Sequence, residues 1–226
     1  MGGDVPKQYL KIRDKEMICH VIDRLGSHPR IHGLVIGADI HDDQFQQCEG
    51  NVVAISEAGP ERAITVYNGL QKIIDLINNE KRDVSDIVDN DWVMVHDAAR
   101  PLLRSADIDR LIDAAARHRD GAILAMPLVD TIKRSDSSTS IVETLDRSIL
   151  WRAATPQLFP LQRLYHALDE TIRKGITVTD EANAMELVGA RPVLVEGASD
   201  NIKVTTPADL KLAEWLLTQQ VEEELQ

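Results

Sequence analysis

Apolar and polar positions alternate along the chain with two periods, which predict where strands and helices lie. Short apolar runs rich in β-branched residues indicate buried strands, at 34–36, 52–55, 92–95, 121–126 and 192–195. Apolar residues recur with helical spacing over 17–25, 62–77, 106–117, 161–174, 180–188 and from 207 into the acidic tail. Alternating strands and helices predict an α/β fold, with a Rossmann-like, mostly parallel sheet flanked by helices.

Several helix ends carry recognisable signals. Thr206 stands before Pro207, which is typical of a helix start because the hydroxyl accepts a free amide and proline suits the first turn. Thr179 precedes two acidic residues, and we expect it to cap the next helix in the same way. Gly175 and Gly189 are expected to end helices.

Residues 130–157 interrupt the alternation of strands and helices. Two strand-like halves flank a serine-rich turn at 135–140, which predicts a protruding β-hairpin arm over about 128–156. A hairpin alone does not bury its apolar side chains, so the arm packs on its own domain or on a neighbouring subunit. No linker divides the chain, so 1–226 is expected to form one domain.

Composition and charge narrow the classes of partner. The 226 residues carry a formal net charge of -12, whereas nucleic-acid binding requires surplus lysine and arginine, so we expect no nucleic-acid partner. The sequence has neither a membrane-length apolar run nor a signal peptide, which predicts a cytoplasmic protein without a membrane partner. Cys19 and Cys48 lack the number and spacing of a disulfide framework, and we expect both to be reduced.

The strand at 92–95 is followed by the polar sequence HDAARP. Ligands of open α/β sheets bind at the carboxyl ends of strands, where Asp97 is suited to hold a metal ion or a hydroxyl and Ala98 allows close approach to the backbone. A capped polar turn with a surface salt bridge from Arg100 explains these residues equally well. His96 is as consistent with a buried hydrogen-bonding residue as with a base.

Two further segments join strands to helices. Gly59 and Thr65 lie where a glycine turn enters a helix, whose amides can bind an anion or the edge of a base. Asp200 and Lys203 follow the strand at 192–195, although such a pair is more often a solvated ion pair. The sequence lacks the motifs of serine hydrolases, P-loop proteins and Rossmann dehydrogenases.

Taken together, seven segments resemble the 2-C-methyl-D-erythritol 4-phosphate cytidylyltransferase family: PKQYL (6–10), ERAITV (61–66), VHDAARP (95–101), DTIKR (130–134), TLDRSILWRAATPQLF (144–159), TDEA (179–182) and DNIKVTTPADL (200–210). The resemblance covers essentially the whole chain. It implies transfer of CMP from CTP to methylerythritol phosphate, with release of pyrophosphate, in non-mevalonate isoprenoid precursor biosynthesis. Such a reaction requires positioning and charge neutralisation, because the attacking phosphate is already ionised at neutral pH.

The resemblance also implies roles for individual residues. Lys7 would contact the CTP phosphates and stabilise the transition state, while Arg147 and Lys203 would hold the methylerythritol phosphate. Asp97 would contact that substrate or a metal, and Asp200 would lie near the metal, which is expected to be Mg²⁺ or another divalent cation. Substrate contacts are implied for seven other residues, Gly59, Thr65, Ala98, Arg100, Thr131, Thr155 and Thr179.

A homodimer is implied as well, because two arms interlock in this family and each active site borrows residues from the other subunit. The resemblance places Thr131, Arg147 and Thr155 on the arm. The arm is therefore expected to combine hydrophobic subunit contacts with a polar edge that faces substrate.

The sequence departs from the family at two places. Pro60 stands where a polar residue is common. The family begins with a buried strand and an A-A-G-x-G-x-R-M loop, whose final methionine corresponds to Met1, so we expect weak CTP binding, slow turnover and exposed sheet edges. Two alternatives are a ribitol-5-phosphate cytidylyltransferase and a non-catalytic, dimeric relative that binds sugar phosphates.

Overall fold

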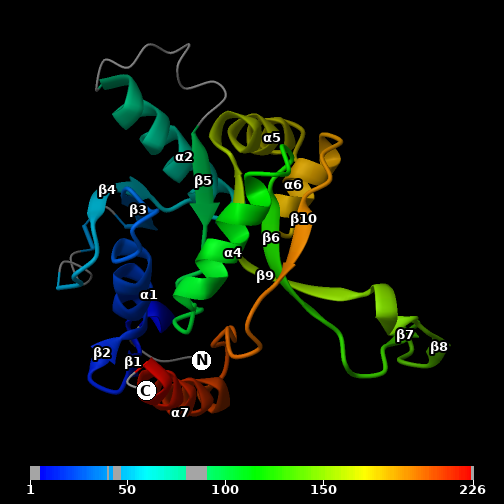
Figure 1. Cartoon of the computed structure of the whole chain (residues 1–226). Helices are drawn as coiled ribbons and strands as arrows, with labels where there is room; N and C mark the ends of the chain where they lie inside the picture. The colour runs from blue at the N-terminus through cyan, green and yellow to red at the C-terminus, as the bar shows by residue number, and fades with distance from the viewer. Residues whose placement is uncertain (1–5, 40, 43–46, 80–90, 225–226) are drawn as a thin grey trace.

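The computed structural model describes residues 6–39, 41–42, 47–79 and 91–224. Its central sheet consists of β5 (Trp92–Val95), β6 (Ala122–Pro127), β9 (Trp151–Pro160) and β10 (Val193–Glu196). The strand order is β10-β6-β9-β5 (Figure 1). Three strands point the same way, whereas β9 runs antiparallel to both of its neighbours.

Helices cover both faces of this sheet. The longer ones are α1 (Met17–Gly26), α2 (Arg62–Asn79), α4 (Ser105–Ala115), α5 (Leu161–Arg173), α6 (Glu181–Leu187) and α7 (Pro207–Glu224). Successive side chains of a strand point to opposite faces, so Ile123 of β6 packs with α2, α5 and α6, and Leu124 packs with α1 and α4. The predicted α/β class, with helices flanking a central sheet, is confirmed.

A second, smaller sheet lies beside α1. β3 (Leu34–Ala38) and β4 (Val52–Glu57) pair in parallel, and among the described residues they share no ladder with the central sheet. Apolar residues of both strands pack on α1 and on the short helix η1 (Lys7–Tyr9) that precedes it. The segment that carries Lys7 therefore rests against this strand pair.

The helix-end predictions are confirmed with one exception. The Thr206 hydroxyl accepts the Asp209 amide at 3.2 Å, and Gly175 and Gly189 have φ angles of 64° and 85°. The predicted cap at Thr179 is wrong. The N-cap of α6 is Asp180, whose carboxylate accepts the Asn183 amide at 2.9 Å. The cap lies one residue later, and the Ala182 amide, which a cap at Thr179 would serve, donates instead to Gln157 Oε1 at 2.8 Å.

The predicted hairpin is present, but the structure moves its second boundary. β7 (Lys133–Ser135) and β8 (Ile141–Thr144) pair antiparallel around the serine-rich turn and project from the body, followed by the short helix η2 (Arg147–Ile149) (Figure 1). The sequence pattern predicted an arm that extends to residue 156. In the structure, β9 is buried from Ala154 onward and pairs with β5 and β6, so residues 154–156 belong to the central sheet.

The prediction of two reduced cysteines is wrong. Cys19 of α1 and Cys48, which precedes β4, form a disulfide with Cα atoms 4.9 Å apart. They are separated by 29 residues, so their proximity arises from the packing of α1 on the β3–β4 pair, which local spacing does not reveal. In the described part of the chain, no helix is both long and apolar enough to cross a membrane.

Candidate active site

Three distant segments meet at the carboxyl end of β5. The Asp97 carboxylate accepts Arg62 Nε at 3.0 Å and Lys203 Nζ at 2.8 Å. Arg62 begins α2, and Lys203 lies in the loop between β10 and α7. Burial would raise the pKa of Asp97, but Lys203 and Arg62 outweigh it and hold that pKa below its ordinary value.

Arg62 is clamped between two carboxylates. Its Nη1 and Nη2 donate to the two oxygens of Glu181 at 2.6 and 2.9 Å, and the Glu181 side chain is only 1% exposed. Burial acts to lower the pKa of Arg62, but Glu181 and then Asp97 raise it above its ordinary value. The bidentate contact fixes the guanidinium in the plane that presents its third nitrogen to Asp97.

Lys7 belongs to the same electrostatic group. The pKa of Lys7 is lowered first by burial and second by the charge of Lys203, while Asp209 and Asp97 act in the opposite direction. Burial lowers the pKa of Arg100, and the charge of Asp97 acts in the opposite direction. The four cations Lys7, Arg62, Arg100 and Lys203 therefore outnumber the three carboxylates Asp97, Glu181 and Asp209, which gives a local positive charge in a chain whose formal net charge is -12.

The turn that carries Asp97 is held from behind by buried hydrogen bonds. Thr155 Oγ1 accepts the Asp97 amide at 3.0 Å and lies 3.1 Å from His96 Nδ1, while His96 Nε2 lies 3.0 Å from the Arg100 carbonyl oxygen. Burial lowers the pKa of His96 to about 4. A neutral histidine with both nitrogens engaged supports the hydrogen-bonding interpretation over that of a base.

Thr155 is not on the arm, contrary to the sequence analysis. It lies in β9 with 4% of its surface exposed, and its hydroxyl is occupied by the turn at His96 and Asp97. The structure therefore makes Thr155 a residue that positions Asp97 from within the sheet.

A falling pH is expected to destabilise the fold through His96. The pKa of His96 is about 4 in the folded protein and 6.5 in the unfolded chain. Between these pH values, His96 is protonated in the unfolded chain and neutral in the folded protein. Stability from this group is complete above pH 6.5 and decreases by roughly 3 kcal/mol as the pH falls to 4. Urea unfolding at several pH values, compared with His96→Asn, isolates this contribution. Identical pH dependence in the two proteins would contradict it.

Asp200 points to a different set of partners. Its Oδ2 accepts Arg104 Nε at 2.9 Å and Gln220 Nε2 at 2.8 Å. Gln220, on α7, also donates to the Leu102 carbonyl oxygen at 3.1 Å. Asp200 thus ties α7 to the loop that carries Lys203 through one carboxylate oxygen, while its Oδ1 is buried without a hydrogen-bond partner among the described residues.

A Mg²⁺ ion would find few protein ligands at this site. Among the described residues, no three His, Cys, Asp or Glu side chains gather in a way that could hold a metal. Mg²⁺ commonly uses one or two carboxylates together with substrate phosphates and water, and Asp97 fits such a single carboxylate ligand. The donor set therefore suits a cation that arrives with a polyphosphate.

The turn before α2 is closed by its own residues. The Gly59 amide donates to Thr65 Oγ1 at 2.9 Å, and a Cβ on Gly59 would collide with Ile64. The Thr65 hydroxyl and the Gly59 amide are therefore engaged with each other within the turn. Ala98, beside Asp97, packs on the apolar cluster beneath η1.

Three predicted residues are separate from Asp97 in the contacts of a single chain. Thr131 and Arg147 are exposed on the projecting arm, where the Arg147 guanidinium donates to the Val129 carbonyl oxygen (Figure 1). Thr179 is exposed before α6, and its amide donates to Asn183 Oδ1 at 3.4 Å. The structure gathers Lys7, Asp97 and Lys203 but leaves the arm residues outside this group.

Arg62 and Glu181 were missed as site residues by the sequence analysis. Both lie in segments that carry the family resemblance, ERAITV and TDEA. Each is also typical of a charged residue in the first turn of a helix. No local pattern predicts that Arg62 and Glu181, which are 119 positions apart, form an ion pair.

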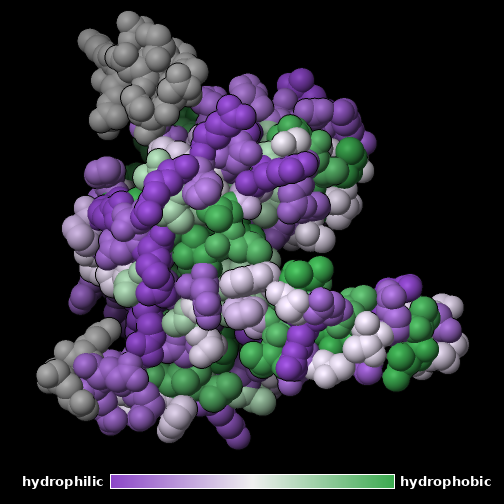
Figure 2. Space-filling model, turned by 45° about the vertical axis from the view of Figure 1, so that its right-hand side comes forward, coloured by the Kyte–Doolittle hydropathy of each residue, from purple (hydrophilic) through white to green (hydrophobic). Residues whose placement is uncertain are grey.

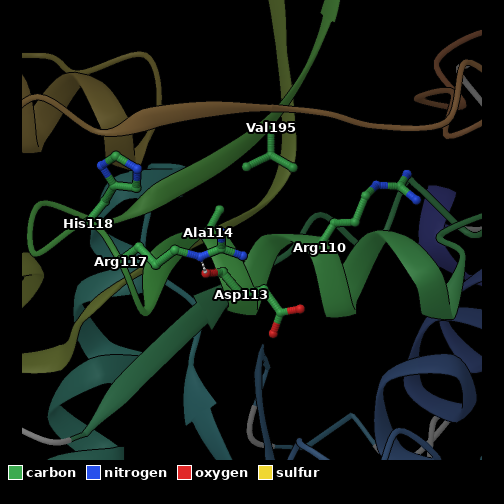
Figure 3. Close-up of a pocket in the computed structure, with 6 residues that line it drawn as sticks. All are labelled: Arg110, Asp113, Ala114, Arg117, His118 and Val195. Atoms are coloured by element: carbon green, nitrogen blue, oxygen red, sulfur yellow. Dashed lines mark hydrogen bonds between the residues drawn. The ribbon is translucent and has the colours of Figure 1, made fainter.

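A shallow pocket of about 310 Å³ lies elsewhere, along α4 (Figure 3). Its lining residues come from α4, the loop that follows it and β10, namely Arg110, Asp113, Ala114, Arg117, His118 and Val195. Arg110 pairs with Asp107, and Arg117 donates to the Asp113 carbonyl oxygen at 3.0 Å. The charges of this pocket already have protein partners, and none of its residues contributes to the group around Asp97.

Comparison with known proteins identifies the family. The family model "IspD: 2-C-methyl-D-erythritol 4-phosphate cytidylyltransferase" matches residues 1–219. The chain belongs to this family. A Tolumonas auensis protein named 2-C-methyl-D-erythritol 4-phosphate cytidylyltransferase is 46% identical over 223 residues, which are 97% of this chain and 92% of the relative. A Haemophilus influenzae protein of the same name is 45% identical over 219 residues, with coverage of 96% and 91%.

Solved structures of the IspD family share this fold. A crystal structure of 4-diphosphocytidyl-2C-methyl-D-erythritol synthase matches with a TM-score of 0.78 and 37% identity, covering 94% of this chain and 95% of the other. The Francisella tularensis IspD structure matches with a TM-score of 0.79 and 31% identity, covering 94% of each chain. The chain is therefore a nucleotidyltransferase of the IspD family.

Proposed function

We propose that the group around Asp97 is where this IspD-family chain binds CTP and methylerythritol phosphate for CMP transfer. The observation that supports this proposal most directly is that Arg62 and Lys203, from two distant segments, bind the Asp97 carboxylate, and that Lys7 lies within reach of the charges of Lys203 and Asp97 in an otherwise acidic protein. Two polyanionic substrates repel each other, so a local excess of cations is what their approach requires.

The reaction forms one P–O bond and breaks another. A phosphate oxygen of methylerythritol phosphate attacks the α-phosphorus of CTP, and the bond to the β-phosphate breaks to release pyrophosphate. The attacking oxygen is already ionised at neutral pH, so no general base is needed. This agrees with His96, which is neutral and engaged at both ring nitrogens.

Each cation then has a separate task. Lys7 neutralises charge on the CTP phosphates, and Lys203 holds the incoming sugar phosphate. Asp97, fixed by Arg62, orients Lys203 in the free protein and accepts hydroxyl groups of the sugar once the phosphate has engaged that lysine. Mg²⁺, bound with CTP, supplies further charge neutralisation at the phosphates.

Pyrophosphate release tests this function. The chain with CTP and Mg²⁺ is expected to release pyrophosphate when methylerythritol phosphate is added, and to be much slower with ribitol 5-phosphate. The opposite preference would assign the site to ribitol phosphate, and saturable binding of sugar phosphate without pyrophosphate release would indicate a binding protein. Because CTP is a cytoplasmic metabolite, we place the enzyme in the cytoplasm.

The arm carries an apolar surface suited to a second subunit. Figure 2 shows apolar side chains along the projecting hairpin, and the exposed ones are Val129, Ile141, Val142, Ile149 and Trp151. We propose a homodimer in which each arm covers the other, so that Thr131 and Arg147 of one subunit reach the site of its partner.

Sedimentation velocity tests the homodimer at micromolar protein concentration. The chain is expected to sediment as a dimer, and Ile149→Glu, at a position 76% exposed in the single chain, is expected to yield monomers with reduced CMP transfer. The control is Val53→Glu, another exposed apolar residue that lies in β4, away from the arm. A monomeric parent chain would refute the proposal.

A further inference from the structure

The disulfide lies in the apolar cluster that supports the Lys7 segment. Cys19 is buried with Tyr9, Ile18 and Ile22, and Ala98, the neighbour of Asp97, packs on the same cluster. Tyr9 is the last residue of η1, which begins at Lys7. The covalent bond therefore sits directly beneath two parts of the proposed active site.

Hydrogen bonds join η1 and α1 to residues on both sides of Cys48. The Tyr9 hydroxyl donates to the Asp42 carboxylate, and the Glu49 amide donates to Asp23 Oδ1 of α1 at 2.7 Å. Asp42 and Glu49 flank Cys48 along the stretch between β3 and β4. The disulfide is thus the covalent member of a set of links that holds η1 and α1 against this stretch.

The two sulfur atoms differ in how a reactant would meet them. Cys19 is 1% exposed, whereas Cys48 is only partly buried and lies between the exposed residues Gln47 and Glu49. Cys19 is also the third residue of α1, where the positive end of the helix dipole favours a thiolate. Attack at Cys48 with Cys19 as the leaving group is therefore the favoured direction.

We propose that Cys19 and Cys48 form a thiol–disulfide exchange site for a low-molecular-weight thiol and its disulfide, of the glutathione class, and that its state sets how firmly the Lys7 segment is held. Disulfides of intracellular proteins are mostly transient, and many act in redox sensing. The intracellular setting and the consequence for CMP transfer rest on the proposed function, but the exchange chemistry measured below does not.

The exchange balances with glutathione alone. A glutathione thiolate attacks Cys48 Sγ, the bond to Cys19 breaks, and Cys19 leaves as a thiolate that takes a proton from water. A second glutathione thiolate attacks the mixed disulfide, which releases Cys48 as a thiolate and forms glutathione disulfide. Two electrons pass from two glutathione molecules to the protein, and the reverse steps restore the bond.

Alkylation and hydrogen exchange test the proposal without any substrate. The chain is equilibrated in buffers of varied ratio of glutathione to glutathione disulfide, and alkylation followed by mass spectrometry counts its free thiols. We expect conversion between no thiols and two. Amide exchange of peptides within 7–22 is expected to be at least about tenfold faster in the reduced protein. The reason is that reduction removes the cross-link that closes the loop between Cys19 and Cys48.

Peptides from α5, far from the disulfide in the contact network, serve as the internal control and are expected to change little. Thiols that do not interconvert with the glutathione ratio would overturn the exchange site. Equal exchange at 7–22 in both states would overturn its link to the Lys7 segment. Cys48→Ser keeps the buried Cys19, and its amide exchange at 7–22 is expected to match that of the reduced protein at every glutathione ratio.

CMP transfer supplies the last arm of the test. The reduced protein and Cys48→Ser are expected to show the same several-fold decrease in kcat/KM for CTP relative to the oxidised protein. If neither the oxidised nor the reduced protein transfers CMP, but amide exchange at 7–22 still differs between them, the proposed function is refuted and the exchange site is supported. Equal kcat/KM in both states would refute the effect on catalysis.

Discussion

Replacing Lys203 with methionine is expected to lower kcat/KM for CMP transfer to methylerythritol phosphate by about 100- to 1000-fold, the usual cost of removing one charge-stabilising group. Lys203 Nζ lies 2.8 Å from Asp97 Oδ2, and 44% of the side chain is exposed, so its ammonium group can reach a bound phosphate. Its removal takes away a substrate cation and leaves Asp97 to repel the incoming dianion. Initial rates of pyrophosphate release give the measurement.

The matched control is Lys211→Met, which removes an exposed lysine of α7 that follows the same loop. This variant loses the same charge from the protein, and its kcat/KM is expected to stay close to that of the parent. Equal losses in both variants would mean that Lys203 acts only through the overall field, and no loss in Lys203→Met would remove it from the site.

Replacing Arg62 with methionine is expected to affect folding and catalysis together. Glu181 is 1% exposed and would lose both of its guanidinium hydrogen bonds, and an unpaired buried carboxylate destabilises a protein by about 3 kcal/mol or more. Asp97 would lose the contact that holds its Oδ1. Urea unfolding measures the change in stability, and pyrophosphate release measures the change in activity.

The double variant Arg62→Met/Glu181→Met separates the two effects. Replacing both members of a buried ion pair with apolar residues often restores stability, so this protein is expected to unfold close to the parent midpoint. Its activity is expected to stay low, because Asp97 is still not anchored. A double variant with parental activity would show that Arg62 contributes to the fold alone.

Local pattern predicted the strands whose character is local. The strand at 92–95 was predicted with the boundaries that the structure gives, because four apolar residues end at a polar turn. β9 was merged with the arm, since its sequence WRAATPQLFP continues from the hairpin without a turn signal. The second half of β9 is buried because it pairs with β5 and β6, and a local sequence segment does not predict pairing between distant strands.

The candidate site was predictable only in part. Family resemblance named Lys7, Asp97 and Lys203, and the structure brings all three together. The place of Asp200 beside a metal stays a prediction, whereas its contacts with Arg104 and Gln220 depend on the fold and were not predictable from a local pattern. The disulfide escaped notice for the same reason.

Other sequence expectations stay predictions. The identity of the metal, the sugar contact of Thr179, the base contact at Gly59 and Thr65, and weak binding of CTP are in this class. Each concerns a contact with a substrate or an ion, and the packing of the protein chain does not determine such contacts by itself.

A double-mutant cycle tests the central claim, which is that Lys7 and Lys203 serve one pair of reacting phosphates. The kcat/KM for CMP transfer would be measured for the parent chain, Lys7→Met, Lys203→Met and the double variant. Residues that act on a shared partner show interaction free energies of about 0.5–3 kcal/mol, so the double variant is predicted to lose distinctly less or more than the sum of the single losses. Strictly additive losses would place the two lysines in independent sites and contradict the account.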